Sequence, residues 1–118
     1  MILREFVLDI DESNYAEILE KELVVLQFFS DWKMNCLMTL PMVEDIAKDF
    51  CEKYPELCFG RVNIDEFEEL AQKHNIVSVP TILILRNGKV FSRVDGSLQE
   101  DFLRNKISEI CGSHGLVI

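Results

Sequence analysis

The most constraining feature of the sequence is an apolar run from Leu23 to Phe29, which is interrupted only by Gln27. A half-exposed strand alternates between apolar and polar residues, whereas a run of this length without alternation fits a strand that is buried on both faces. Such strands occur in parallel sheets that are covered by helices on either side. The run therefore predicts an α/β domain with this strand near its centre.

Regular structure is predicted to alternate along the whole chain. Strands are expected over residues 6–10, 23–29, 57–64, 80–85 and 89–94, and helices over 11–22, 35–54, 66–75 and 98–110. The early alternation requires right-handed crossovers between parallel strands, whereas Asn87-Gly88 is a strong hairpin signal that adds antiparallel strands. We therefore expect a mixed five-stranded sheet flanked by four helices. Residues 1–111 are expected to form one domain, and residues 112–118 a C-terminal tail.

Several details of the helices follow from residue type and spacing. Asp11 or Ser13 is expected to cap the first helix, and Asn75 is placed to close the third in the left-handed conformation. Pro41 is expected to kink the second helix, because its ring removes one backbone donor and crowds the preceding turn. The residues expected to face the core are Met38, Met42, Ile46 and Phe50 on the second helix, and Phe102, Leu103, Ile107 and Ile110 on the last.

The composition argues against nucleic-acid and membrane partners. The net charge of −9 repels nucleic acid and anionic lipid, both of which select for basic patches. No segment approaches the roughly 18 uninterrupted apolar residues that a membrane helix needs. Residues 1–10 include Arg4, Glu5 and Asp9, so they lack the apolar stretch of a signal peptide. We therefore expect a cytoplasmic location.

The cysteine pattern predicts neither a metal site nor another cofactor. The chain has four cysteines, and no pair shows the two-residue spacing of a zinc knuckle or of a redox dithiol. Cys51, Cys58 and Cys111 are each expected to be buried hydrophobic residues. Whether Cys51 and Cys58 ever form a disulfide bond stays open, although a reducing compartment argues against it.

Four short motifs in order along the chain resemble the thioredoxin family over about residues 6–110. They are a strand leading into Ser30-Asp31-Trp32, a helix start at Lys33-Met34-Asn35-Cys36 followed by Pro41, the strand end Val62-Asn63-Ile64-Asp65, and Val79-Pro80-Thr81 followed by Asn87-Gly88-Lys89 and Gly96. The resemblance implies the thioredoxin fold and a cis bond before Pro80. It also implies a peptide-binding groove at Trp32, Val79, Pro80 and Gly96, where the backbone of Val79 pairs with a peptide by edge-strand addition.

The sequence departs from the family at the residues that carry its chemistry. A thioredoxin uses one low-pKa cysteine to attack a disulfide and a second cysteine to release the product. The family motif Trp-Cys-Gly-Pro-Cys reads here Trp32-Lys33-Met34-Asn35-Cys36, so Lys33 replaces the attacker and only the resolving position holds sulfur. Gln27 matches a buried carboxylate of the family, and an amide cannot act as an acid or base.

The remaining site residues each have two interpretations. Cys36 is either an inert, half-buried thiol, which we favour, or a reactive one stabilised by the helix start and Lys33. Lys33 is either an anion-binding group at a helix N-terminus or a solvated surface lysine, and the second is favoured. The acidic residues Asp65, Glu66, Glu68 and Glu69 are expected to be a solvated helix start.

Three functions follow from these interpretations. The favoured one is a module that binds a peptide or protein partner in the groove beside Pro80 and has no dithiol-disulfide reductase activity. The first alternative is a single-cysteine thiol-disulfide oxidoreductase that acts in cell redox homeostasis through Cys36. The second alternative is a structural or dimerising scaffold. The oligomeric state stays open.

Overall fold

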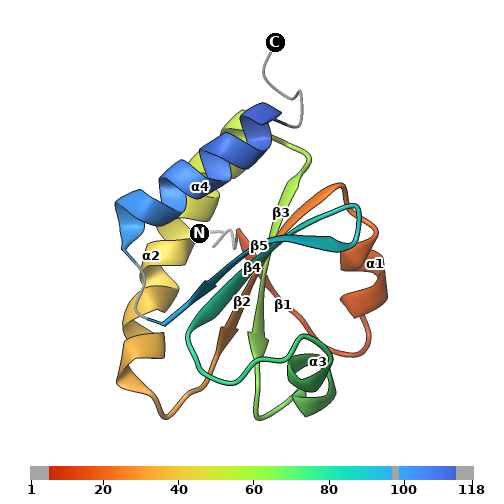
Figure 1. Ribbon diagram of the computed structural model, residues 1–118, viewed down its shortest axis with the longest axis vertical. Coiled ribbons are helices and arrows are strands. Elements are labelled where there is room, and N and C mark those ends of the chain that lie inside the picture. The colour runs from red at the N-terminus through yellow and green to blue at the C-terminus, as the bar shows by residue number, and fades with distance from the viewer. Residues whose placement is uncertain (1–5, 97–98, 114–118) are drawn as a thin grey trace, which may run out of the picture.

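The computed structural model describes residues 6–96 and 99–113, which form a five-stranded mixed sheet between two layers of helices (Figure 1). The strands are β1 (Val7–Asp9), β2 (Leu23–Phe29), β3 (Leu57–Asn63), β4 (Thr81–Arg86) and β5 (Lys89–Asp95), and the helices are α1 (Tyr15–Leu19), α2 (Met34–Lys53), α3 (Glu68–Lys73) and α4 (Glu100–Ser113). The strand order is β1-β3-β2-β4-β5. Strands β1, β3 and β2 are parallel, whereas β4 and β5 run antiparallel, which confirms the predicted sheet.

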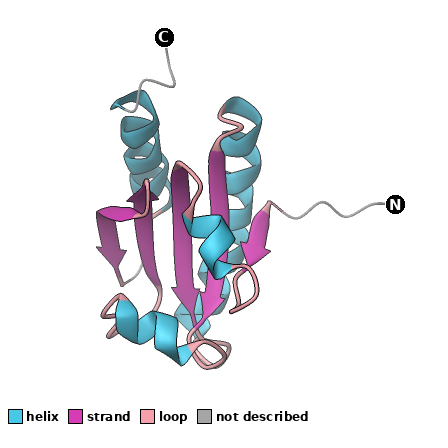
Figure 2. Ribbon diagram, turned by 90° about the vertical axis from the view of Figure 1, so that its right-hand side faces the viewer, coloured by secondary structure: helices cyan, strands magenta, loops and turns pink. Residues whose placement is uncertain are grey.

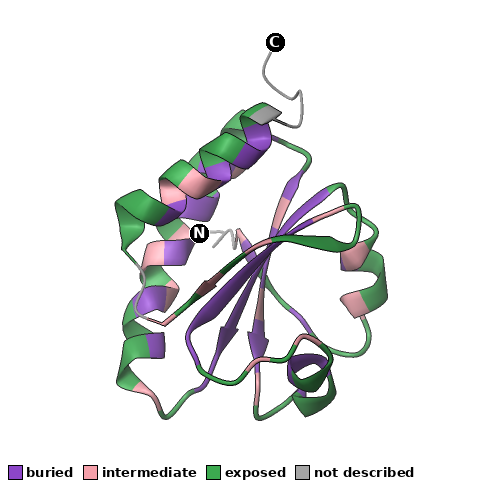
Figure 3. Ribbon diagram, viewed as in Figure 1, coloured by how far each residue is buried: buried purple, intermediate pink, exposed green. Residues whose placement is uncertain are grey.

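The central strand β2 is buried along its whole length, as its unbroken apolar run predicts. The two long helices α2 and α4 cover one face of the sheet and the two short helices cover the other (Figure 2). Side chains on either face of the sheet therefore enter separate cores: Val25 and Ile84 face α2 and α4, whereas Leu26 and Leu83 belong to the core that includes Ile18 of α1. Figure 3 shows that the outer faces of the helices and the edge strand β5 are mainly exposed.

Helix α1 is shorter than predicted because the residues before it form their own hydrogen-bonded turn. The Asp11 carboxylate accepts a bond from the Ser13 backbone N–H, and the Asp11 N–H donates to Oδ1 of Asn14, both at 2.9 Å. Such side-chain bonds give the backbone an alternative to the helix. The N-cap is Asn14, so the expectation that Asp11 or Ser13 caps the helix is wrong.

The inward face of α2 differs from the predicted stripe. Ile46 and Phe50 are buried, but Met38 is 69 % exposed. The buried positions are Cys36, Thr39, Val43, Ile46, Ala47 and Phe50. The helix continues on both sides of Pro41, and the predicted kink there stays a prediction.

The last helix also corrects two expectations. Phe102 was predicted to face inward, yet it is 49 % exposed and lies under the ammonium of Lys106. Helix α4 continues through Ser113, two residues into the predicted tail. The rest of that tail lies outside the described residues.

The structure confirms the predicted left-handed conformation of Asn75 and the predicted hairpin at Asn87-Gly88. Asn75 closes the segment after α3 with φ 54°, and Asn87 and Gly88 form the β4–β5 hairpin with φ 51° and 81°. Positive φ at both central residues is what a type I′ hairpin requires. None of the helices in the described ranges is long and apolar enough to cross a membrane.

Candidate functional site

The predicted site residues from Trp32 to Cys36 lie where β2 ends and α2 begins, and a hydrogen-bond network holds this junction. The Asp65 carboxylate, just after β3, accepts bonds from Ser30 Oγ at 3.2 Å and from Trp32 Nε1 at 3.1 Å. The amide of Asn63 bridges the same segments, because it donates to Asp31 and accepts from the Asp65 N–H. The acidic residues Asp65, Glu66, Glu68 and Glu69 are exposed, as expected. In addition, Asp65 anchors the indole ring of Trp32.

Cys36 is the only thiol of the motif, and it is 0 % exposed. It lies in the first turn of α2 and packs in the core that also contains Phe28 and Phe29. Its carbonyl accepts a bond from Thr39 Oγ1 at 2.7 Å. The thiol is thus more deeply buried than the predicted half-buried group, and a disulfide in solvent has no route to it without movement of the helix start.

Lys33 occupies the N-cap position of α2, but its side chain turns away from the helix. Its Nζ donates a hydrogen bond of 3.2 Å to the backbone carbonyl of Val79, on the loop before β4. The side chain is half-buried, so the expectation of a solvated surface lysine is wrong. This contact joins residues 46 positions apart, and no local pattern in the sequence indicates it.

Of the predicted groove residues, Val79, Pro80 and Gly96 lie together, whereas the indole of Trp32 bonds Asp65. The Val79–Pro80 peptide bond is cis. The Pro80 carbonyl accepts a bond of 2.9 Å from the N–H of Gly96, whose φ of 85° is readily adopted only by glycine. Val79 and Pro80 are buried. The backbone N–H of Val79 has no acceptor in the part of the chain that the structure describes.

Four large apolar side chains at the start of α2 and on the loop before β4 face solvent. We call them the apolar rim; they are Trp32, Met34, Met38 and Val77, and between 68 % and 89 % of each residue's surface is exposed. Met34 and Met38 are one helical turn apart, so they share one face of α2. Contiguous exposed apolar surface usually marks a site of interaction rather than a packing accident.

Arg93 on β5 holds the loop that leads to the groove. Its guanidinium donates to the carbonyls of His74 and Asn75 at 2.9 and 2.8 Å. It also pairs with Asp95, whose carboxylate accepts a bond from the Thr81 hydroxyl at 3.0 Å. The end of α3, the start of β4 and the edge strand are therefore tied together. Sequence reasoning missed Arg93, because no motif contains it.

Gln27 is buried on β2, below the motif, and contacts Thr39 of α2. Its Nε2 donates to Thr39 Oγ1 at 3.3 Å, whereas its Oε1 has no partner within residues 6–96 and 99–113. The expectation that Gln27 lies under the site is met through Thr39, which also bonds the Cys36 carbonyl. An amide here satisfies part of the polar environment but moves no proton.

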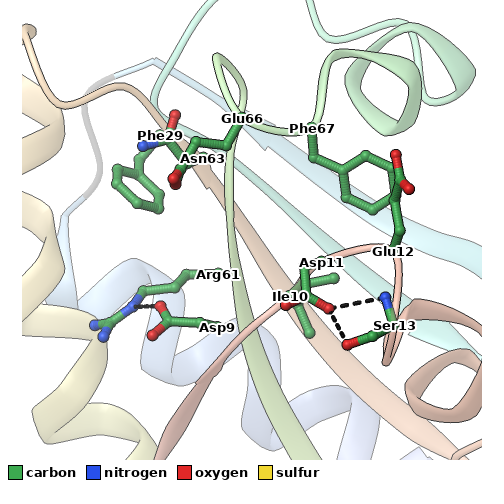
Figure 4. Close-up of a pocket in the computed structure, with 10 residues that line it drawn as sticks. All are labelled: Asp9, Ile10, Asp11, Glu12, Ser13, Phe29, Arg61, Asn63, Glu66 and Phe67. Carbon is green, nitrogen blue, oxygen red and sulfur yellow. Dashed lines mark hydrogen bonds and ion pairs between the residues drawn. The ribbon is translucent and has the colours of Figure 1, made fainter.

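A separate hollow of about 560 Å³ lies at the carboxyl ends of β1, β2 and β3 (Figure 4). Two of its acids are engaged in contacts within the chain: Asp9 bonds Arg61 at 2.7 Å, and Asp11 accepts from the Ser13 N–H. The lining includes none of the residues Trp32, Lys33, Val79 and Pro80. The predicted site is thus separate from this hollow.

The other three cysteines are free thiols outside the site. Cys111 is buried, whereas Cys51 and Cys58 are half-buried, less than expected. Burial raises the pKa of Cys51 and of Cys111 to about 11, so both are protonated and weakly nucleophilic at neutral pH. No group of three or more potential ligands lies close enough to hold a metal ion in the described ranges.

Comparison with known proteins identifies the family. The sequence profile of the family described as Thioredoxin matches residues 6–109. The chain belongs to the thioredoxin family. It is 30 % identical to thioredoxin of Chlamydia pneumoniae over 100 residues, which is 85 % of this chain and 94 % of the relative. It is 33 % identical to thioredoxin of Chlorobaculum thiosulfatiphilum over 103 residues, or 86 % and 93 % of the two chains.

The fold of a solved thioredoxin agrees with that assignment. The crystal structure of thioredoxin from Trypanosoma brucei brucei superposes with a TM-score of 0.79 at 28 % identity, and the match covers 95 % of this chain and 97 % of the other. The chain is therefore a thioredoxin-family domain over nearly its whole described length. Within that domain, the N-cap of α2 carries an ammonium group and the first turn carries one buried thiol.

Proposed function

We propose that this thioredoxin-family chain binds a peptide or protein partner and does not reduce disulfides as a dithiol enzyme. The observation that carries the proposal is that the motif has one thiol: Lys33 stands at the N-cap, and the single thiol, Cys36, is 0 % exposed. Dithiol reduction needs one thiolate that reaches the target and a second thiol that releases it. A single buried thiol supports neither the attack nor the release.

The binding half of the proposal is supported by the surface around Val79. Its backbone N–H has no acceptor among residues 6–96 and 99–113, and the exposed Val77 of the apolar rim precedes it by two residues. In edge-strand addition, backbone hydrogen bonds supply affinity and pockets for alternate side chains supply specificity. An extended segment of a partner protein fits this arrangement. The four free thiols agree with a reducing compartment, and we place the protein in the cytoplasm.

The second candidate is a single-cysteine oxidoreductase, which the relatives named thioredoxin favour. The Cys36 thiolate would attack a disulfide, form a mixed disulfide and expel one thiolate. An external thiol would then have to attack the mixed disulfide and restore Cys36. Turnover on that route requires opening of the first turn of α2 and increases with the concentration of added thiol.

Insulin reduction by dithiothreitol separates the two candidates. We expect wild-type protein and Cys36→Ser to leave the rate at that of dithiothreitol alone, because neither offers an accessible thiol pair. Circular dichroism of both proteins confirms that they are folded. A wild-type rate that exceeds that of Cys36→Ser and increases with dithiothreitol concentration would reject the proposal and establish the single-cysteine route.

A further inference from the structure

The contact between Lys33 Nζ and the Val79 carbonyl is not explained by the stability of α2. The positive end of a helix dipole disfavours an ammonium group at the N-cap. Lys33 nevertheless lies half-buried, whereas Trp32 and Met34 on either side of it are exposed. The 3.2 Å bond to Val79 offsets part of that cost and fixes the side chain across the groove. The contact between Lys33 and Val79 therefore affects which peptides the groove can bind.

An extended peptide that pairs with Val79 lies beside Lys33. A residue that pairs with a neighbouring strand in the hydrogen-bonded register exchanges both its N–H and its carbonyl. At Val79 the N–H is free of acceptors in the described part of the chain, and the carbonyl accepts one bond from Lys33. A carbonyl oxygen has two lone pairs, so a peptide N–H can share this acceptor with Lys33. Full pairing of a peptide with Val79 therefore places the peptide next to the ammonium group.

We propose that Lys33 makes the groove selective for an extended peptide that carries a carboxylate next to the residue paired with Val79. This inference rests on the proposed function. Lys33 forms no ion pair with any carboxylate in the described ranges, and its ammonium group has three donors, of which the Val79 carbonyl takes one. A carboxylate of the peptide adds a charge-assisted bond to this group, whereas a neutral peptide covers the half-buried charge without neutralising it.

The start of α2 favours the same charge on the peptide. The backbone N–H groups of Met34 and Asn35 have no acceptor within the described residues, as at most helix N-termini. They and the helix dipole attract a negative group beside Lys33. The net charge of −9 acts in the opposite direction, because the overall field of the protein favours a basic peptide. The expected preference for an acidic peptide therefore comes from Lys33 and the helix start, whereas the net charge of the protein predicts the opposite preference.

A matched peptide series tests the inference at physiological ionic strength. The host is a blocked, extended Val/Thr/Ala peptide, and one Glu, Ala or Lys is moved through its positions. Binding is followed by the fluorescence of Trp32, the only tryptophan of the chain, which lies on the apolar rim. We expect the best Glu peptide to bind wild type about tenfold more tightly than its Ala counterpart, a difference of about 1.4 kcal/mol.

The variant Lys33→Met removes the charge and the bond but keeps the apolar stem. We expect it to bind the Glu and Ala peptides equally, and to bind the Ala peptide more tightly than wild type does. Lys48→Met, at an exposed position of the same helix, removes the same charge away from the groove and should keep the wild-type preference. Circular dichroism checks that both variants are folded.

Different outcomes would overturn the role of Lys33 and the proposed peptide binding. If Lys33→Met keeps the preference for Glu, or if wild type prefers the Lys peptide, the role of Lys33 is overturned while peptide binding stands. If no peptide of the series changes the fluorescence of wild type or Lys33→Met, both the selectivity and the proposed binding function are overturned.

Discussion

Gln27 shows at the scale of one residue what the site retains and what it has given up. It is 1 % exposed, its Nε2 bonds Thr39, and its Oε1 has no partner in the described ranges. A buried carbonyl oxygen without a donor costs roughly 1–3 kcal/mol. A carboxylate in the same place would cost more when ionised. The amide therefore keeps a polar contact under the motif at moderate cost and without a titrating group.

Removing the orphan oxygen should stabilise the protein. Gln27→Met keeps the length of the side chain and removes both polar atoms, so we expect the free energy of unfolding to rise by about 1 kcal/mol. Urea unfolding measures the change. Thr39→Val is the matched control: it removes the hydroxyl that bonds the Cys36 carbonyl and should lower stability. A clear loss of stability in Gln27→Met would mean that Oε1 has a partner in solution.

The identities of the site residues were predictable, but their contacts were not. Lys33 and Cys36 stand in a recognisable motif, so the absence of a second sulfur followed directly from the sequence. The bond from Lys33 to Val79 and the bond from Trp32 to Asp65 depend on the loops that the sheet places side by side. Charge spacing along the chain predicts the exposed acidic helix start that includes Asp65, but it says nothing about a tryptophan 33 residues earlier.

At the scale of elements, buried strands were predicted better than helix faces. The bounds of β2 were predicted to the residue, because a strand buried on both faces has an unbroken apolar run. On α2 the predicted stripe placed Met38 in the core, yet Met38 lies on the apolar rim. Spacing alone cannot separate a methionine that packs from one that faces a partner. On α4, helical spacing likewise predicts that Phe102 faces the core, whereas Phe102 is 49 % exposed.

The hydrogen bonds from Arg93 to the end of α3 give a prediction at the scale of elements. Arg93→Met breaks two bonds to the carbonyls of His74 and Asn75 and the pair with Asp95. We expect faster amide hydrogen exchange in residues 75–79 and weaker binding of a peptide to the groove. Global stability should fall by less than about 1–2 kcal/mol, because Arg93 is largely a surface group.

The control for Arg93→Met is Lys89→Met, which removes a charge from the same strand at an exposed position. It should leave exchange in residues 75–79 unchanged. Equal exchange in the wild type and Arg93→Met would show that the loop is held by other contacts, and that Arg93 has no role in shaping the groove.

At the scale of the whole molecule, the sheet order assembles the site from three distant segments. Because β2 lies between β3 and β4, the start of α2 meets Asp65 on one side and Val79 on the other. The two cores fix these strands from both faces. The fold therefore preserves the geometry of the groove independently of whether sulfur is present at the helix start. The proposed binding function without dithiol chemistry requires this separation.

The most direct test of that separation is the rate of insulin reduction by wild type and Lys33→Cys, measured side by side with the same dithiothreitol. Lys33→Cys supplies a second sulfur at the N-cap of α2, three residues before Cys36. We expect wild type to stay at the background rate and Lys33→Cys to exceed it. Adding Gln27→Asp should raise the rate further by providing a proton acceptor, at some cost in stability. Wild-type protein that reduces insulin as fast as Lys33→Cys would contradict the proposed loss of dithiol chemistry.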